Sequence, residues 1–139
     1  MHSQSCTSRL ARYRTAEAFE VEPGVRFREM IRREDGARTM IVGLATFAPG
    51  ASLPCHVHNV EETVTILTGR ALCVVEGQET TEVEPFDSSF IPPHVAHRFI
   101  NASDSEPLTI QWIYGLVDEH GRAVAEVERT LVAPARCER

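Results

Sequence analysis

The sequence contains no lysine, so all fourteen of its basic side chains other than histidine are arginines. A chain without lysine cannot form a Schiff base through an ε-amino group or supply the lysine of a phosphate-binding loop. The formal net charge is −6 at pH 7, and the arginines are scattered, with Arg32 and Arg33 as the only adjacent pair. Because nucleic-acid binding requires a basic face, we expect no nucleic-acid partner.

Long apolar runs and closely spaced cysteine pairs are also missing. No apolar stretch approaches the ~20 residues that span a bilayer, and none follows the first residues. We therefore expect no membrane association, no signal peptide and a cytoplasmic location. The cysteines show no C-x-x-C spacing, and we expect four free thiols: Cys6, Cys55, Cys73 and Cys137. Strand alternation turns Cys55 away from the face of its neighbour His56, which argues against a catalytic thiol.

Glycine and proline, by contrast, are frequent, with eight of each. They separate short runs rich in Val, Ile and Thr, and this punctuation predicts about ten strands. The predicted strands cover residues 25–32, 38–47, 53–58, 62–67, 71–76, 80–84, 88–91, 97–101 and 108–115, with 124–132 as a last strand or short helix. Many short strands at this spacing are typical of an all-β sandwich or barrel.

The length predicts a single domain. A chain of 139 residues has the size of one ordinary domain with its own core. We place the β-barrel at residues 23–132 and a short C-terminal tail at 133–139. We expect residues 1–22 to form an N-terminal segment that is partly ordered or contacts a second copy of the chain.

Four of the six histidines fall in two tight groups, His56 with His58 and His94 with His97. Side chains two residues apart on a strand share a face, so the first pair would converge on one point. Glu62 follows closely and could face the same point from the next strand. Imidazoles and a carboxylate together suit Zn, Fe, Ni or Mn. A single buried histidine is more often a hydrogen-bonded structural residue, so the surrounding pattern decides between these interpretations.

The residues around the first histidine pair resemble the first motif of the cupin family at every fixed position. Gly50 is followed by five residues, then His56-x-His58, three residues, Glu62, six residues and Gly69. The resemblance implies a cupin-type jelly-roll β-barrel that holds one divalent metal ion inside its mouth.

The segment 86–101 is similar to the second cupin motif, with Pro92, His97 and Asn101 in the expected places. The resemblance thus implies four metal ligands: His56, His58, Glu62 and His97. Phe86 and His94 stand where the family usually has glycine. We expect a different approach turn at Phe86, because glycine tolerates a positive φ and phenylalanine does not. Histidine is tolerated in a left-handed turn better than most residues.

By resemblance, the function is that of a metal-dependent enzyme acting on a small organic molecule. Few charged residues fall on the presumed inner faces of the strands, so we expect few charged groups in the pocket and a largely apolar substrate. Four protein ligands leave positions open for substrate on a metal that accepts six, as catalytic sites require. Dioxygenases and Lewis-acid cyclases, isomerases or lyases, polyketide cyclases among them, share the barrel, and the ligand set does not choose among them. A non-catalytic binding or sensing module is the alternative. The resemblance also implies a homodimer, with residues 12–19 and 124–132 as candidate contacts.

Four further residues are candidates for contact with a substrate. His94 could act as a general acid or base, because histidine titrates near neutral pH, or be a solvent-exposed loop residue. Alternation puts Trp112 on one face of strand 108–115 and Gln111 on the other. The sequence leaves open which face lines the cavity, so both are pocket candidates, together with Phe99.

Overall fold

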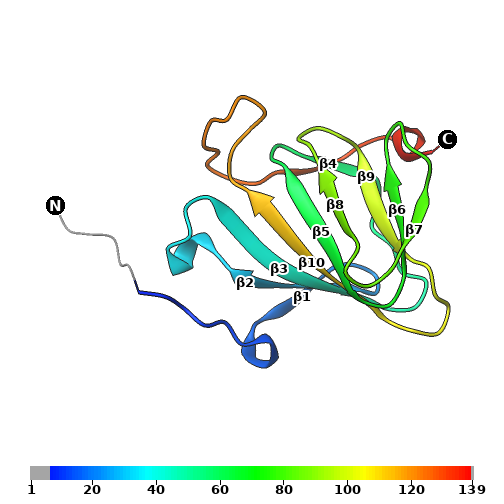
Figure 1. Ribbon diagram of the computed structural model, residues 1–139, viewed down its shortest axis with the longest axis horizontal. Coiled ribbons are helices and arrows are strands. Elements are labelled where there is room, and N and C mark those ends of the chain that lie inside the picture. The colour runs from blue at the N-terminus through cyan, green and yellow to red at the C-terminus, as the bar shows by residue number, and fades with distance from the viewer. Residues whose placement is uncertain (1–6, 139) are drawn as a thin grey trace.

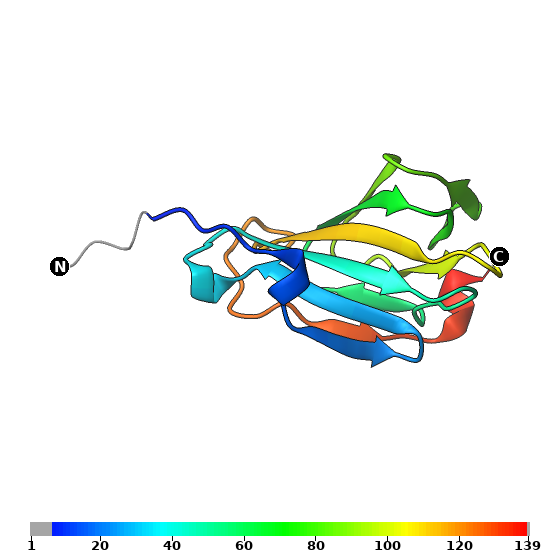
Figure 2. The same ribbon diagram turned by 90° about the horizontal axis from the view of Figure 1, so that it is seen from below.

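The computed structural model describes residues 7–138, which form two antiparallel β-sheets facing each other (Figures 1 and 2). The first sheet has the order β1 (Ala18–Glu22), β2 (Val25–Ile31), β3 (Met40–Phe47), β10 (Leu108–Gly115), β5 (Glu62–Thr68) and β8 (Ser88–Ile91). The second has the order β11 (Arg129–Leu131), β4 (His56–His58), β9 (His97–Asn101), β6 (Ala71–Val75) and β7 (Thr81–Val83). The three 3₁₀ helices are η1 (Tyr13–Thr15), η2 (Arg33–Asp35) and η3 (Pro134–Cys137). This architecture confirms the predicted all-β jelly-roll barrel.

The strands predicted between residues 25 and 115 all occur, with changes at some ends. β4 begins at His56 rather than at residue 53, and Pro54, which has no backbone N–H to donate, lies in the missing part. β1 arises within the segment placed before the barrel and pairs with β2. The expected last strand shrinks to the three residues of β11, which pair with β4. Figure 2 shows the segment that contains β11, coloured orange to red, running toward the C-terminus.

The barrel interior is apolar at one end and polar at the other. At the apolar end, Leu108 pairs with Phe47, which also pairs with Val25, and all three side chains are fully buried. At the opposite end of β10, Tyr114 pairs with Glu62, whose carboxylate is also buried. The alternating burial along β5 and β10 follows from the two-residue period of a strand. The hydrophobic core therefore closes one end of the barrel and leaves the other for a polar site.

A disulfide joins Cys55 to Cys137, with 5.9 Å between the Cα atoms. The prediction of free thiols was therefore wrong for these two residues, because a pairing across 82 residues leaves no short spacing to recognise. Cys73 is a free, buried thiol as predicted, and Cys6 lies outside the described residues. Since disulfides persist mainly in oxidising compartments, the bond removes the thiol-based argument for a cytoplasmic location. No helix in the described range 7–138 has the length and apolar character to span a membrane.

Among residues 7–138, two residues other than glycine adopt a positive φ, Phe86 with 77° and His94 with 67°. We expected Phe86 to avoid a positive φ and so to change this turn. That expectation was wrong, because Phe86 adopts the left-handed conformation. Hydrogen bonds hold the turn, because the Phe86 N–H donates to the Ile66 carbonyl over 2.7 Å. The Asp87 carboxylate also accepts from the Glu84 N–H over 2.9 Å. At His94 the left-handed turn agrees with the tolerance expected of histidine.

Candidate metal centre

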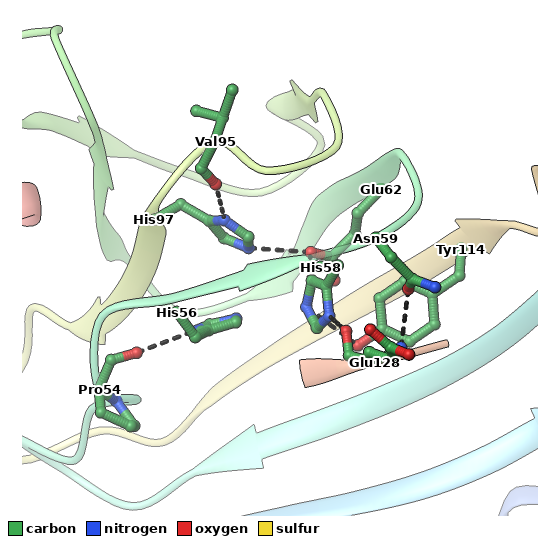
Figure 3. A network of polar contacts seen from close by, with 9 residues as sticks. All are labelled: Pro54, His56, His58, Asn59, Glu62, Val95, His97, Tyr114 and Glu128. Atoms are coloured by element: carbon green, nitrogen blue, oxygen red, sulfur yellow. Dashed lines mark hydrogen bonds and ion pairs between the residues drawn. The ribbon is translucent and has the colours of Figure 1, made fainter. Parts of the chain in front are cut away.

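Three histidines and one glutamate converge inside the polar end of the barrel (Figure 3). His56 and His58 alternate with an outward residue on β4, so both point inward. His97 on β9 is the direct cross-strand partner of His56. One ring nitrogen from each of the three lies within 4.8 Å of the others. Glu62, the first residue of β5, reaches them from the other sheet.

Each of the three imidazoles has its Nδ1 atom on a backbone carbonyl. The partners are Pro54 O for His56 at 2.7 Å, Glu128 O for His58 at 3.0 Å, and Val95 O for His97 at 3.0 Å. A carbonyl oxygen only accepts hydrogen bonds, so Nδ1 carries the proton in every ring. In a neutral ring with this tautomer the lone pair lies on Nε2, and histidine then binds a metal through Nε2.

The position of Glu62 indicates that the cluster fits a cation. Its Oε1 atom lies 3.0 Å from His97 Nε2 and 3.6 Å from His58 Nε2. A carboxylate oxygen and two imidazole lone pairs repel one another unless a proton or a cation lies between them. Three nitrogen donors and one oxygen donor are the ligand types that divalent transition metals prefer. The residues present therefore fit a metal ion.

Burial keeps the imidazoles of His56 and His58 neutral. Desolvation, together with the smaller effect of the neighbouring His97, lowers the pKa of His56 to about 3. Desolvation also lowers the pKa of His58, although the Glu62 carboxylate opposes the shift. Both rings are therefore unprotonated at neutral pH, which is the state required for metal binding.

Two cavities adjoin the cluster. The inner cavity, about 20 Å³, is lined by His56, Glu62 and His97. The outer cavity, about 420 Å³, opens from His58 toward the space between β1, β2 and residues 125–129. The two share four lining residues: Phe27, Trp112, Tyr114 and Arg129. This common wall makes the outer cavity the approach to the histidine cluster.

The structure answers which face of β10 lines the cavities. Trp112 is buried and lines both, and Phe99 on β9 is buried and lines the inner one. Gln111 lies on the opposite face of β10, is only partly buried, and lines neither cavity. Tyr114, on the same face as Trp112, places its hydroxyl 3.5 Å from His58 Nε2. Burial raises the pKa of Tyr114, so this hydroxyl stays protonated.

His94 is not brought to the cluster. Its Nε2 atom lies 3.2 Å from a carboxylate oxygen of Glu119, and its side chain is 55% exposed. The residue lines neither of the two cavities. Its contact with the site is through the backbone, where its N–H donates to the His58 carbonyl over 2.8 Å.

Arg129 is a cavity residue that the sequence reasoning missed. It lies opposite His58 in the register of β11 and β4 and lines both cavities. No signal pointed to it, because residues 124–132 carried no assigned strand direction or face. The expectation of few charged groups in the pocket also needs correction. Four charged side chains line the outer cavity: Glu29, Arg33, Glu126 and Arg129.

Solved structures similar to this chain share its fold at low sequence identity. The polyketide cyclase RemF from Streptomyces resistomycificus has 22% identity and a TM-score of 0.72, covering 95% of this chain and 92% of that one. An RmlC-like cupin from Shewanella frigidimarina has 17% identity and a TM-score of 0.68, with coverages of 82% and 96%. The DMSP lyase DddQ from Ruegeria pomeroyi has 19% identity and a TM-score of 0.68, with coverages of 87% and 63%. These likenesses show the fold.

A comparison with curated proteins gave no significant match. The family described as Cupin domain matches residues 43–114, which is more than half of the chain and includes all four converging residues. On this match, together with the jelly-roll architecture, the chain belongs to the cupin family.

Proposed function

We propose that this cupin binds one divalent metal ion through His56, His58, Glu62 and His97 and is a metal-dependent enzyme. The observation that carries the proposal is that all three imidazoles have the same hydrogen bond, from Nδ1–H to a backbone carbonyl. Carbonyl partners of this kind orient imidazole ligands and fix their tautomer in metalloproteins. The donor set suits Zn, Fe, Mn or Ni.

The substrate is a small organic molecule held in the outer cavity. A bound divalent ion supplies Lewis-acid polarisation of a substrate oxygen or, if it is redox-active, dioxygen chemistry. Phe27 and Trp112, with ring centroids 5.5 Å apart, give the substrate an apolar wall that excludes water. Tyr114, rather than His94, holds the proton that can be donated to the substrate, because its neutral hydroxyl lies beside His58.

The reaction belongs to the cyclase, isomerase or lyase type, with a dioxygenase as the alternative. A neutral proton donor beside a Lewis-acid site supports the first type. Structures similar in fold include a polyketide cyclase, a DMSP lyase and an oxalate oxidase, which supports an enzyme over a non-catalytic binding module. Iron as the bound metal would favour the dioxygenase, whereas ligand binding without conversion by the metal-loaded protein would favour the binding module.

Metal content tests the site directly. We expect about one metal ion per chain in the wild-type protein by inductively coupled plasma mass spectrometry, and none in His97→Ala. His120→Ala removes an exposed histidine outside the cluster and should keep its metal. Circular dichroism verifies that each variant is folded. A wild-type protein without metal after reconstitution, or a His97→Ala variant that retains it, contradicts the proposal.

We also propose that the chain forms a homodimer. The two candidate contact segments expose large apolar side chains, Tyr13 and Phe19 in the first and Leu131 in the second, each more than 40% exposed. Pairing would cover these side chains together with the sheet edge. Sedimentation velocity should give the mass of two chains, and a monomer at micromolar concentration contradicts this.

A further inference from the structure

Arg129 brings a positive charge to the histidine cluster. It pairs with His58 across β11 and β4, and directly paired side chains project from the same face of a sheet. Of the four charged residues that line the outer cavity, Arg129 also lines the inner one. Arg33 instead donates to the Val124 carbonyl, and Glu29 and Glu126 line only the outer cavity. Arg129 is therefore the charged group placed to meet a ligand beside the metal ligands.

The guanidinium of Arg129 is weakly engaged by the protein. Its ion pair within residues 7–138 joins Nη2 to Glu22 Oε2 over 3.4 Å, and both side chains are about one-third exposed. Exposed pairs of this kind contribute little to stability. A guanidinium carries five N–H donors in a planar fork that matches a carboxylate. Most of these donors consequently stay available to a ligand.

The side chain of Trp112 lines the same space as Arg129. Trp112 is 2% exposed, and its indole Nε1–H has no hydrogen-bond partner among the described residues. Because Trp112 and Arg129 line the same two cavities, one ligand can approach both.

Aromatic rings form the wall beside these donors. Phe27 lies between Phe19 and Trp112, with centroid distances of 6.3 and 5.5 Å, and Tyr114 follows Trp112 at 4.8 Å. Rings in such a row pack favourably against another flat, unsaturated body. The outer cavity of about 420 Å³ lies within the usual range for small-molecule sites.

We infer that the substrate is a planar, unsaturated organic anion whose carboxylate-type oxygens bind Arg129 while its body packs against Phe27 and Trp112. This inference rests on the proposed function, because it names the substrate class of the same site. It narrows the largely apolar molecule expected from the sequence to one that carries a single anionic group.

Paired probes of matched shape test the inference. We would titrate zinc-reconstituted protein with 2-naphthoate and with 2-naphthamide by isothermal titration calorimetry. We expect the wild type to bind the anion at least tenfold more tightly than the amide. Arg129→Gln should remove this preference and leave the amide affinity unchanged, and Arg129→Lys should retain part of it. Arg70→Gln, which removes a surface arginine paired with Glu82, should behave as the wild type.

Glu22→Gln should change the affinity for 2-naphthoate in the opposite direction from Arg129→Gln. It removes the carboxylate that competes for Arg129, so affinity for 2-naphthoate should rise severalfold. This variant keeps Arg129 in place, so the inference remains testable even if Arg129→Gln does not fold. Repeating the titrations on zinc-free protein separates binding to Arg129 from direct coordination of the carboxylate to zinc.

Several outcomes overturn the inference. These are equal affinity for the two probes, a preference that survives Arg129→Gln, and no binding of either probe at millimolar concentration. Metal content measured on the same samples keeps the two proposals distinct. One metal per chain without an Arg129-dependent preference contradicts only the substrate class. A preference that depends on Arg129 in protein that never binds metal contradicts only the proposed metal-dependent function.

Discussion

Phe86 occupies a backbone conformation that is unfavourable for a residue with a β-carbon. Its φ of 77° lies in the left-handed region, and its side chain is 81% exposed, so burial offers little compensation. The conformation costs roughly 1–2 kcal/mol relative to the right-handed region. Hydrogen bonds across the turn, such as the one from the Phe86 N–H to the Ile66 carbonyl, keep the residue there.

Phe86→Gly should therefore stabilise the protein. Relief of the backbone strain outweighs the entropy that glycine gains in the unfolded chain, and we expect about 0.5–1 kcal/mol more stability. Chemical denaturation of metal-free protein measures the change. Phe90→Gly is the matched control, because Phe90 is also exposed but lies in β8 without a positive φ. The control should lose roughly 0.5–1 kcal/mol, and an equal loss in Phe86→Gly would contradict the strain argument.

At the scale of elements, an ion pair attaches the 3₁₀ helix η3 to the turn that follows β6. Arg136 donates to both carboxylate oxygens of Glu76, over 2.8 and 3.0 Å. Hydrogen bonding from Arg136, with a further bond from the Ala96 N–H, lowers the pKa of Glu76 to about 2. Arg136 also donates to the His94 carbonyl over 3.2 Å. One side chain thus connects η3 to the loop that precedes His97.

This pair predicts an acid-dependent contribution to stability. The folded-state pKa of Glu76 lies below its ordinary value of 4.5, so the contribution is complete above pH 4.5 and disappears as the pH falls toward 2. Glu76→Gln should unfold at a lower temperature than the wild type at pH 7. The gap should narrow steadily between pH 4.5 and 3 in calorimetric scans. Glu79→Gln, an exposed change nearby, should show no such convergence, and a constant gap for Glu76→Gln would refute the assignment.

Some elements are readable from the sequence and others are not. Glycine and proline punctuation located the strands from β2 to β10, because turns and alternation are local properties. β11 is three residues long and exposed throughout, so it carries no alternation that would reveal its face. Its position follows from pairing with β4, about seventy residues away. For the same reason the sequence identified His58 but neither Arg129 opposite it nor the Glu128 carbonyl that orients it.

On the scale of the whole molecule, the C-terminal segment closes the barrel around the candidate metal centre. β11 covers the free edge of β4, and the Asn59 side chain bonds to the backbone of Glu126 and Glu128. The Cys55–Cys137 disulfide fixes the far end of this segment beside His56. The site is therefore assembled from the middle of the chain and completed by its last described part. Motif spacing predicted the ligands from the middle of the chain. The position of the C-terminal segment depends on contacts between residues distant in sequence, which the motifs do not contain.

Removal of the disulfide should lower global stability. A bond across 82 residues destabilises the unfolded chain by up to about 4.5 kcal/mol on the chain-entropy model. We expect Cys137→Ser to reduce the free energy of unfolding by a few kcal/mol and to weaken metal binding, because residues 126–132 lose their anchor. Wild-type protein in reductant should match Cys137→Ser, which reductant should leave unchanged. Equal wild-type stability with and without reductant would show that the bond is absent or energetically neutral.

The hydrogen bonds that orient the three imidazoles have an evolutionary consequence. Their acceptors are main-chain carbonyls of residues 54, 95 and 128, and every amino acid supplies such a carbonyl. Side-chain identity at these positions can drift between homologues while the imidazoles keep the same tautomer. Sequence comparison would then detect the histidine ligands but not the carbonyl groups that orient them. Those carbonyls can be identified only from the path of the backbone.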